Sequence, residues 1–170
     1  MDLEYPGNAG RLLSIPDRHY YRGIGVMRGI IKSDIVELST RGFGDTQDIT
    51  DAVAMALEKS GVREGLVTVF CQGSTGTVTT IEFEPGVVRD LREALERIAP
   101  SNVPYHHDEA WHDGNGFSHV RAALMKPSLS IPVMEGKMVL GMWQQIVFVD
   151  FDNRPRKRKV VVQVMGIKNV

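Results

Sequence analysis

The chain has 170 residues, of which 42% are hydrophobic and 24% are charged. This composition is typical of one globular domain and excludes a disordered or fibrous chain. Its 20 Lys and Arg residues against 21 Asp and Glu residues leave a net charge of −1, which argues against a general nucleic-acid binder because phosphate neutralisation needs a surplus of positive charge. Cys71 is the only cysteine, so no disulfide can form within the chain, and a zinc site would depend on histidine and carboxylate ligands.

The first part of the chain is predicted to be an extension that precedes the domain. Residues 1–30 contain two prolines and several glycines without a sustained helical or strand period, so we place an N-terminal extension at residues 1–31 and the domain at residues 32–170. The chain starts without the features of a secretory signal, and no apolar run approaches the roughly 18 residues that cross a bilayer. We therefore expect a cytoplasmic protein that does not bind membranes.

Two helices are predicted from apolar residues at helical spacing. The first runs from Asp48, which can cap its start, to Gly61, which suits its end. The second begins at Glu84 and Pro85, an acidic residue followed by a proline at the first helical position, and stops at Pro100. Each helix has one apolar face, so each is expected to cover a sheet.

Strands are predicted between and after these helices. Residues 65–71 and 77–83 are rich in β-branched and aromatic residues and flank turn residues, which favours a hairpin. Residues 137–140, 143–152 and 159–165 are three further strands, the last two joined as a second hairpin. Both faces of the strand 143–152 are apolar, which indicates that one face is covered by another subunit. The sequence therefore predicts a self-associating α+β domain of mostly antiparallel sheet.

Four of the five histidines lie between Tyr105 and His119. Imidazole is a common metal ligand and transfers protons near neutral pH, and nearby carboxylates can orient it. The spacing of His107, His112 and His119 matches no standard zinc motif. Three interpretations stay open: these histidines bind a divalent metal (zinc or magnesium), they belong to a solvated polar loop, or they bind an anion without metal. Glycines on both sides of Asn115 indicate a tightly bent backbone that could place a side chain in a site.

Ser74 and Thr75 lie between Gly73 and Gly76, where backbone N–H groups and two hydroxyls could hold a phosphate. A plain connection between strands is the alternative. Glu82 and Glu84 are two residues apart, on one face of a predicted strand, where a buried pair would need a metal, an arginine or substrate. The alternative is that Glu84 only caps the following helix.

The basic cluster Arg154–Lys159 supports two interpretations. An ion network with Asp150 and Asp152 across the second hairpin is favoured, and the alternative is that one arginine, such as Arg154, holds a substrate phosphate. Trp143 and Gln144 lie at a strand start, where a tryptophan is usually part of the core, although the amide could recognise a heterocycle.

The segment Leu140–Asp152, followed by Arg154–Arg158, resembles the signature ending of the YjbQ-like family, also called the secondary thiamine-phosphate synthase family. The likeness extends over roughly residues 32–167. The upstream matches are Asp48-Ile49-Thr50, Asp90-Leu91, Tyr105, His107, Asp113-Gly114-Asn115, His119, Ser128, Pro132 and Gly136.

This resemblance implies a β-sandwich with two helices that assembles as a homotrimer, its sheets arranged around the threefold axis. It also implies a thiamine-phosphate synthase activity, which joins a pyrimidine pyrophosphate to a thiazole phosphate. The family's polar site corresponds to Glu82, His107, Asp113, Asn115 and His119, with Trp143, Gln144 and Arg154 nearby. The chain departs from the family at Gly73, where most members carry a histidine.

We expect the ligand to be a phosphorylated small molecule. In a synthase, His107 or His119 would act on the departing pyrophosphate as an acid or metal ligand, and Glu82 would orient a base or a metal. The phosphate oxygens would be held by Ser74, Thr75 and Arg154. Two alternatives are a non-catalytic trimer that binds a metal or an anion, and a metal-dependent phosphate-ester hydrolase.

Overall fold

Eight strands and four helices make up the part of the chain that the structure describes. The structure is a computed structural model that describes residues 29–168. The strands are β1 (Gly29–Thr40), β2 (Asp45–Asp48), β3 (Glu64–Cys71), β4 (Gly76–Ile81), β5 (Ser128–Met134), β6 (Lys137–Met138), β7 (Gln145–Asp150) and β8 (Arg156–Ile167). The helices are α1 (Thr50–Ser60), α2 (Pro85–Ile98), α3 (His106–Trp111) and α4 (Gly116–Met125).

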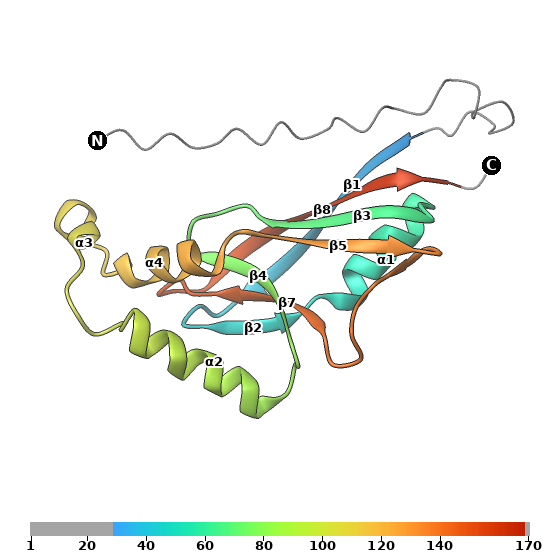
Figure 1. Cartoon of the computed structure of the whole chain (residues 1–170). Helices are drawn as coiled ribbons and strands as arrows, with labels where there is room; N and C mark the ends of the chain where they lie inside the picture. Colours follow the sequence, from blue (N-terminus) through green and yellow to red (C-terminus); the bar gives the residue numbers. More distant parts are fainter. Residues whose placement is uncertain (1–28, 169–170) are drawn as a thin grey trace, which may run out of the picture.

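The strands form two antiparallel sheets with the main hydrophobic core between them (Figure 1). Sheet A has the strand order β1-β8-β3-β5-β6, and sheet B has the order β2-β7-β4. The predicted α+β class and its mostly antiparallel arrangement are therefore confirmed. The number of helices is four rather than two, because the segment predicted as a histidine-rich loop forms α3 and α4.

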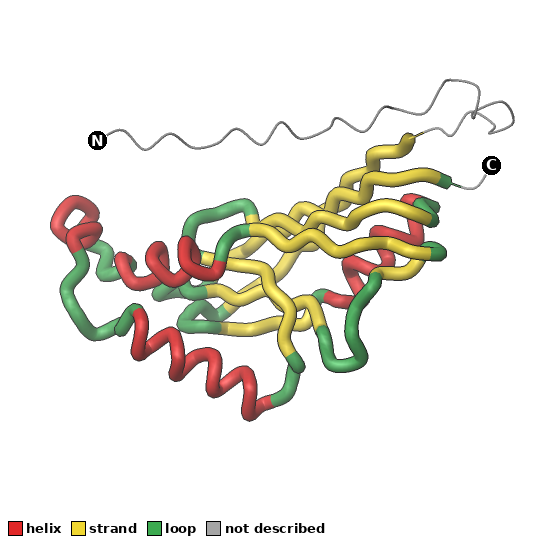
Figure 2. Tube along the Cα trace, in the orientation of Figure 1, coloured by secondary structure: helices red, strands yellow, loops and turns green. Residues whose placement is uncertain are grey.

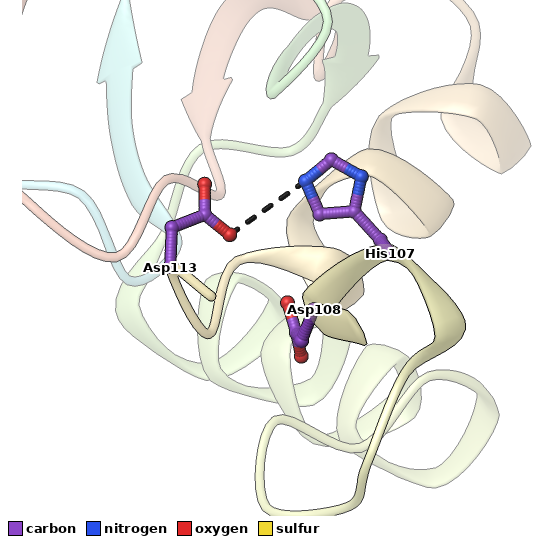
Figure 3. A group of neighbouring side chains, drawn as sticks. All are labelled: His107, Asp108 and Asp113. Carbon is purple, nitrogen blue, oxygen red and sulfur yellow. Dashed lines mark ion pairs between the residues drawn. The ribbon is translucent and has the colours of Figure 1, made fainter. Parts of the chain in front are cut away.

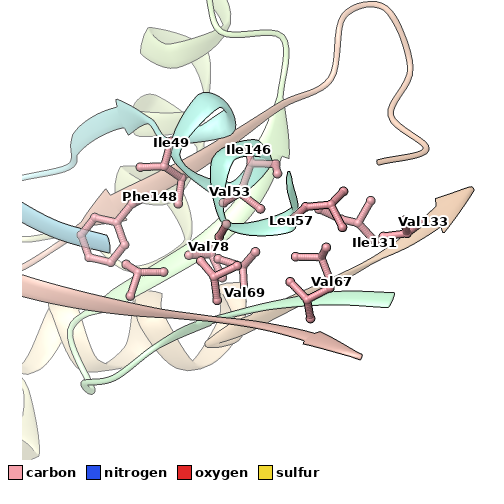
Figure 4. Close-up of a cluster of buried hydrophobic side chains, with 14 of the residues drawn as sticks. Ile49, Val53, Leu57, Val67, Val69, Val78, Ile131, Val133, Ile146 and Phe148 are labelled. Carbon is pink, nitrogen blue, oxygen red and sulfur yellow. The ribbon is translucent and has the colours of Figure 1, made fainter. Parts of the chain in front are cut away.

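The main core consists mostly of aliphatic side chains, together with Phe148, from alternate positions of the two sheets and from one face of α1 (Figure 4). Val160, Val162 and Val164 are buried at every second position of β8, as the side-chain period of a strand requires. Val53 and Leu57 of α1 pack against this layer. Burial of each such side chain contributes about 1.5–3 kcal/mol relative to its exposure to water.

Both predicted helices are confirmed. Gly61 follows α1 in the left-handed conformation, with φ of 68°, which glycine adopts without steric cost. The carboxylate of Glu84 accepts hydrogen bonds from the backbone N–H groups of Gly86 and Val87 at the start of α2. Because β4 already ends at Ile81, Glu84 is a helix cap and does not form a strand pair with Glu82.

Neither predicted hairpin exists. Strand β3 pairs with β5 and β8 in sheet A, whereas β4 pairs with β7 in sheet B. Likewise β7 belongs to sheet B and β8 to sheet A. The two turns therefore carry the chain from one sheet to the other. The prediction failed because an apolar period shows which face of a strand is buried but does not identify its neighbour.

The second apolar face of β7 is not a subunit interface, and this prediction was wrong. Val147, Val149 and Phe151 pack with Leu95 of α2 and Ala122 of α4 in a second hydrophobic cluster. Figure 2 shows α2, α3 and α4 at the end of the molecule opposite α1. The chain's own helices thus cover this face.

The predicted boundary at residue 31 falls inside β1, which starts at Gly29 and pairs with the end of β8. Residues 1–28 of the predicted extension lie outside the described residues. No helix within residues 29–168 is both long enough and apolar enough to cross a membrane.

A buried ion network holds the two sheets together at the turn from β7 to β8, which we call the corner. Arg158 of sheet A donates to both carboxylate oxygens of Asp150 in sheet B, at 2.6 and 2.7 Å. Arg158 also donates to Thr75 at 2.7 Å, and Arg156 donates to Asp152 at 2.8 Å. Both aspartates are completely buried. The predicted ion network is therefore confirmed, although it forms around the corner and not across a hairpin.

We predict that Arg158→Met strongly destabilises the protein. The substitution leaves Asp150 without its bidentate partner in a dry environment, and loss of one member of a buried ion pair costs about 3–5 kcal/mol. Urea unfolding at a fixed protein concentration measures this loss. The matched control is Arg154→Met, which removes an exposed arginine of the same cluster. Equal unfolding midpoints for the two variants would show that the corner network does not stabilise the fold.

Candidate functional site

A cavity of about 480 Å³ lies beside the corner, and we call it the histidine cavity. Its walls come from the connection between β3 and β4, from α3 and the turn after it, from α4, and from the corner. The lining residues are Gly73, Ser74, Thr75, His107, Trp111, Asp113, Asn115, His119, Asp152, Arg156 and Arg158.

A close contact between the two short helices brings their histidines together. A Cβ atom on Gly116, the first residue of α4, would clash with the side chain of Tyr105 and would lie 3.3 Å from the Cβ of His107. Glycine at this position therefore lets α4 start directly against α3. His119, one turn into α4, then faces His107, with 4.3 Å between the ring centroids.

Helix α4 is held in place by a buried arginine. The guanidinium of Arg121 donates to the backbone oxygen of Ala99 at 2.7 and 2.9 Å and forms an ion pair with Glu96 at 2.6 Å. Ala99 ends α2, so Arg121 satisfies a carbonyl at the end of that helix and joins α4 to it. This contact fixes the helix that carries His119.

The surroundings of His119 shift its titration. Its burial, and then the neighbouring imidazole of His107, lower the pKa of His119 below the ordinary value. Asp113, Asp152 and a hydrogen bond with the Ser74 backbone oppose the shift but do not cancel it. The His119 ring is therefore neutral at neutral pH, and it can accept a proton from a bound molecule.

His107 lies beside two carboxylates from the same segment (Figure 3). Its Nε2 atom is 3.6 Å from Oδ1 of Asp113, while Asp108 accepts a hydrogen bond from the backbone of Gly116. Potential ligand atoms of His107, Asp108 and Asp113 all lie within 4.8 Å of one another. One imidazole and two carboxylates suit a divalent cation with an open coordination position.

The predicted set of three histidine ligands does not form. His112 is exposed, ends α3 in a left-handed conformation, and is absent from the cavity lining. Among the described residues, the ligand set that converges is His107 with the two aspartates. The spacing in the sequence could not reveal this, because a helix end and a turn separate His112 from the others.

The corner contributes two guanidinium groups to the cavity wall. Arg156 and Arg158 both line it, and the Nη1 atom of Arg158 lies 3.5 Å from the place where a Cβ on Gly73 would be. Burial alone would raise the pKa of Asp152, but hydrogen bonds from Arg156 and Thr75 outweigh burial and hold the pKa below its ordinary value. The Oδ1 atom of this buried carboxylate has no hydrogen-bond partner.

Six of the predicted site residues meet in this cavity: Ser74, Thr75, His107, Asp113, Asn115 and His119. Asn115 is buried, and its side-chain oxygen accepts hydrogen bonds from Ser118 and from the backbone of Asn153. Thr75 is committed to the corner network, whereas Ser74 is exposed at the rim.

Four other predicted site residues lie outside the cavity: Glu82, Trp143, Gln144 and Arg154. Glu82 is exposed just beyond the far end of β4, where Gln144 donates to Thr80 at 3.2 Å. Strand β4 separates this place from Thr75, which precedes its start. Arg154 points to solvent, because the chain turns the corner between it and Arg156.

Four residues of the cavity were not predicted from the sequence as site residues: Trp111, Asp152, Arg156 and Arg158. Alternation along β8 puts Arg156 and Arg158 on one face, and this signal was present in the basic cluster. Only the path of the chain around the corner shows that this face opens onto the histidines.

The fold and the cavity define an α+β protein of two facing antiparallel sheets with a histidine- and arginine-lined cavity at one corner. Residues 34–167 match the family described as "UPF0047 protein YjbQ-like". The chain belongs to this family, which confirms the resemblance found in the sequence.

Known relatives agree with this assignment. A UPF0047 protein of Methanothermobacter thermautotrophicus is 40% identical over 70% of this chain and 81% of its own length. A solved YbjQ-like protein of unknown function from Sulfolobus solfataricus has a TM-score of 0.78 at 29% identity, over 82% of this chain and 99% of that one. An uncharacterised protein of the same family from Clostridium acetobutylicum has a TM-score of 0.71 at 37% identity, over 77% of this chain and 98% of that one.

We predict that the pKa of His119, followed by NMR, lies below that of a free histidine and rises when His107 is replaced by glutamine. The substitution removes the neighbouring imidazole but leaves the burial, so the rise should be incomplete. Since the folded pKa lies below the unfolded value of about 6.5, the stability that this residue contributes is present above that pH and is lost as the pH falls through the folded pKa.

His112→Gln is the matched control, because it removes an exposed histidine outside the cavity. It should leave the titration of His119 unchanged. A pKa of His119 at or above the ordinary value would contradict the contact between the two imidazoles.

Proposed function

We propose that the histidine cavity binds a phosphorylated small molecule and catalyses transfer of a group from it. The observation that carries the proposal is that two imidazoles and two guanidiniums meet in one cavity. Guanidinium groups bind phosphate oxygens through charge-assisted hydrogen bonds, and imidazoles move the proton that a departing phosphate needs.

The reaction that we propose to test first joins a pyrimidine pyrophosphate to a thiazole phosphate, as the family resemblance implies. The bond from the pyrimidine methylene carbon to pyrophosphate breaks, and a bond from that carbon to the thiazole nitrogen forms. The pyrophosphate leaves with the bonding electrons and can take a proton from a protonated imidazole. Arg156 and Arg158 take over the phosphate-binding role predicted for Arg154, and Asp113 takes over the orienting role predicted for Glu82.

Each imidazole has a separate part in this proposal. His119 is partly buried and neutral at neutral pH, so it can accept a proton from the phosphate chain and, once protonated, return it to the departing pyrophosphate. His107 lies beside both His119 and Asp113, and a carboxylate beside an imidazole orients the ring. Ser74 at the rim offers a hydroxyl to a phosphate oxygen.

We predict that His119→Ala abolishes formation of thiamine phosphate from the two precursors while the protein still folds. Loss of a general acid or base lowers kcat by about 10²–10⁴-fold. The assay is product formation by liquid chromatography, with His112→Ala as the matched control that retains full turnover. Full turnover by the His119→Ala variant, or no product from the wild type, would overturn the synthase assignment.

The second candidate is a metal-binding protein, favoured by the convergence of His107, Asp108 and Asp113. Bound zinc or magnesium at this place could serve a trimer without turnover, or it could lower the pKa of a bound water in a phosphate-ester hydrolase. Elemental analysis of untagged protein, compared with an Asp113→Asn variant, tests the binding directly. Metal without any product favours the binding protein, whereas release of phosphate from model esters that stops with a chelator favours the hydrolase.

We also propose that the chain forms a homotrimer through the outer face of sheet A, with the sheets around a threefold axis. What supports this is an open surface of large apolar side chains on paired strands, which is uncommon on a monomer. The side chains, with their exposed fractions, are Ile31 (64%), Ile35 (53%), Leu66 (40%), Phe70 (41%), Met134 (58%) and Met165 (49%).

We propose separately that the protein acts in the cytoplasm, since its single cysteine needs no oxidising compartment.

We predict that sedimentation velocity gives the wild type about three times the monomer mass of 18.9 kDa. The Phe70→Asp variant should sediment with the mass of the monomer. A carboxylate buried between sheets without a partner would be too costly to desolvate. Ile98→Asp is the matched control, because Ile98 is 65% exposed but lies on α2. A monomeric wild type would refute the trimer.

A further inference from the structure

Trp111 occupies an unusual position for a large aromatic residue. It is the last residue of α3 and lines the histidine cavity, yet 72% of it is exposed. The indole and the imidazole of His107 are close to parallel, with 6.4 Å between their centroids and 23° between their planes. No buried residue belongs to α3, so the indole does not anchor this helix to a core.

The groups of the cavity follow one another in a defined order. Arg158 lies beside Gly73, and the next residue, Ser74, lines the cavity together with His119. His119 is 4.3 Å from His107, and Trp111 lies 6.4 Å beyond His107. The cavity thus has guanidinium groups at its corner end and an aromatic side chain at its α3 end. This order is complementary to a molecule with a phosphate at one end and a flat ring at the other.

We propose that Trp111, together with His107, forms the wall against which a planar ring of the ligand stacks, so that the cavity selects phosphates carrying an aromatic ring. The inference rests on the proposed phosphate-binding function and adds the residue that would recognise the ring of the ligand. Stacked aromatic rings attract one another beyond simple burial of apolar area, at centroid distances of about 4.5–7 Å. A saturated ring of the same size buries similar area but lacks this attraction.

Two phosphate esters of matched size test this proposal: 2-phenylethyl phosphate and 2-cyclohexylethyl phosphate. Isothermal titration calorimetry should show that the wild type binds the phenyl ester about two- to tenfold more tightly, the range expected for one aromatic contact. Trp111→Leu should lose most of the preference for the phenyl ester, because the affinity for the phenyl ester falls more than that for the cyclohexyl ester. The melting temperature and the sedimentation of the variant check that it retains the fold and assembly.

Trp143→Leu is the matched control, because Trp143 is the other tryptophan, is 65% exposed and lies outside the cavity. This variant should keep the preference for the phenyl ester. If the wild type binds both esters equally, or if Trp111→Leu keeps the preference, the role of Trp111 is refuted while phosphate binding stands. If the wild type binds neither ester, the proposed phosphate function fails together with the inference.

Discussion

The contact between Arg158 and Asp150 is the constraint on which the rest of the structure depends. These two residues belong to different sheets, and the chain passes from one sheet to the other between them. A charge pair buried this deeply is tolerated only when its hydrogen bonds are satisfied, and Thr40 and Thr75 complete the set. The corner is thereby fixed, and the direction in which β8 leaves it decides which side chains face the histidines.

The same corner explains why the cavity has its chemistry. Asp152 forms ion pairs with both arginines, and all three residues line the cavity. The opposite wall is supplied by α3 and α4, and α4 packs on sheet B through the second hydrophobic cluster. A phosphate ligand would therefore complete an arrangement of charges that the fold already holds in place, which limits the reorganisation needed on binding.

The sequence allowed prediction of the local features and of the family, but not of the partners of each strand. The caps at Gly61 and Glu84 were readable because they depend on residues next to them in the chain. The neighbours of β3 and β7 could not be predicted, since the alternation of apolar and polar residues along a strand is the same whichever strand pairs with it. For this reason Arg154 and Glu82 were predicted in the site, whereas Arg156 and Arg158 were not. The start of β4 and the start of β8 lie beside the histidines, whereas Glu82 follows the other end of β4. This arrangement depends on the corner, which is a non-local feature.

The histidine pair joins two helices that differ in how firmly they are attached. Helix α4 has five buried residues, including Phe117 and Arg121, whereas α3 has none. A segment with so little buried surface opens at a low free-energy cost, independently of global unfolding. His107 and Trp111 therefore belong to a helix with little buried surface, and His119 to a helix that is anchored in the fold. A ligand that contacts both helices would tie α3 to α4, which should slow amide hydrogen exchange in α3 more than elsewhere.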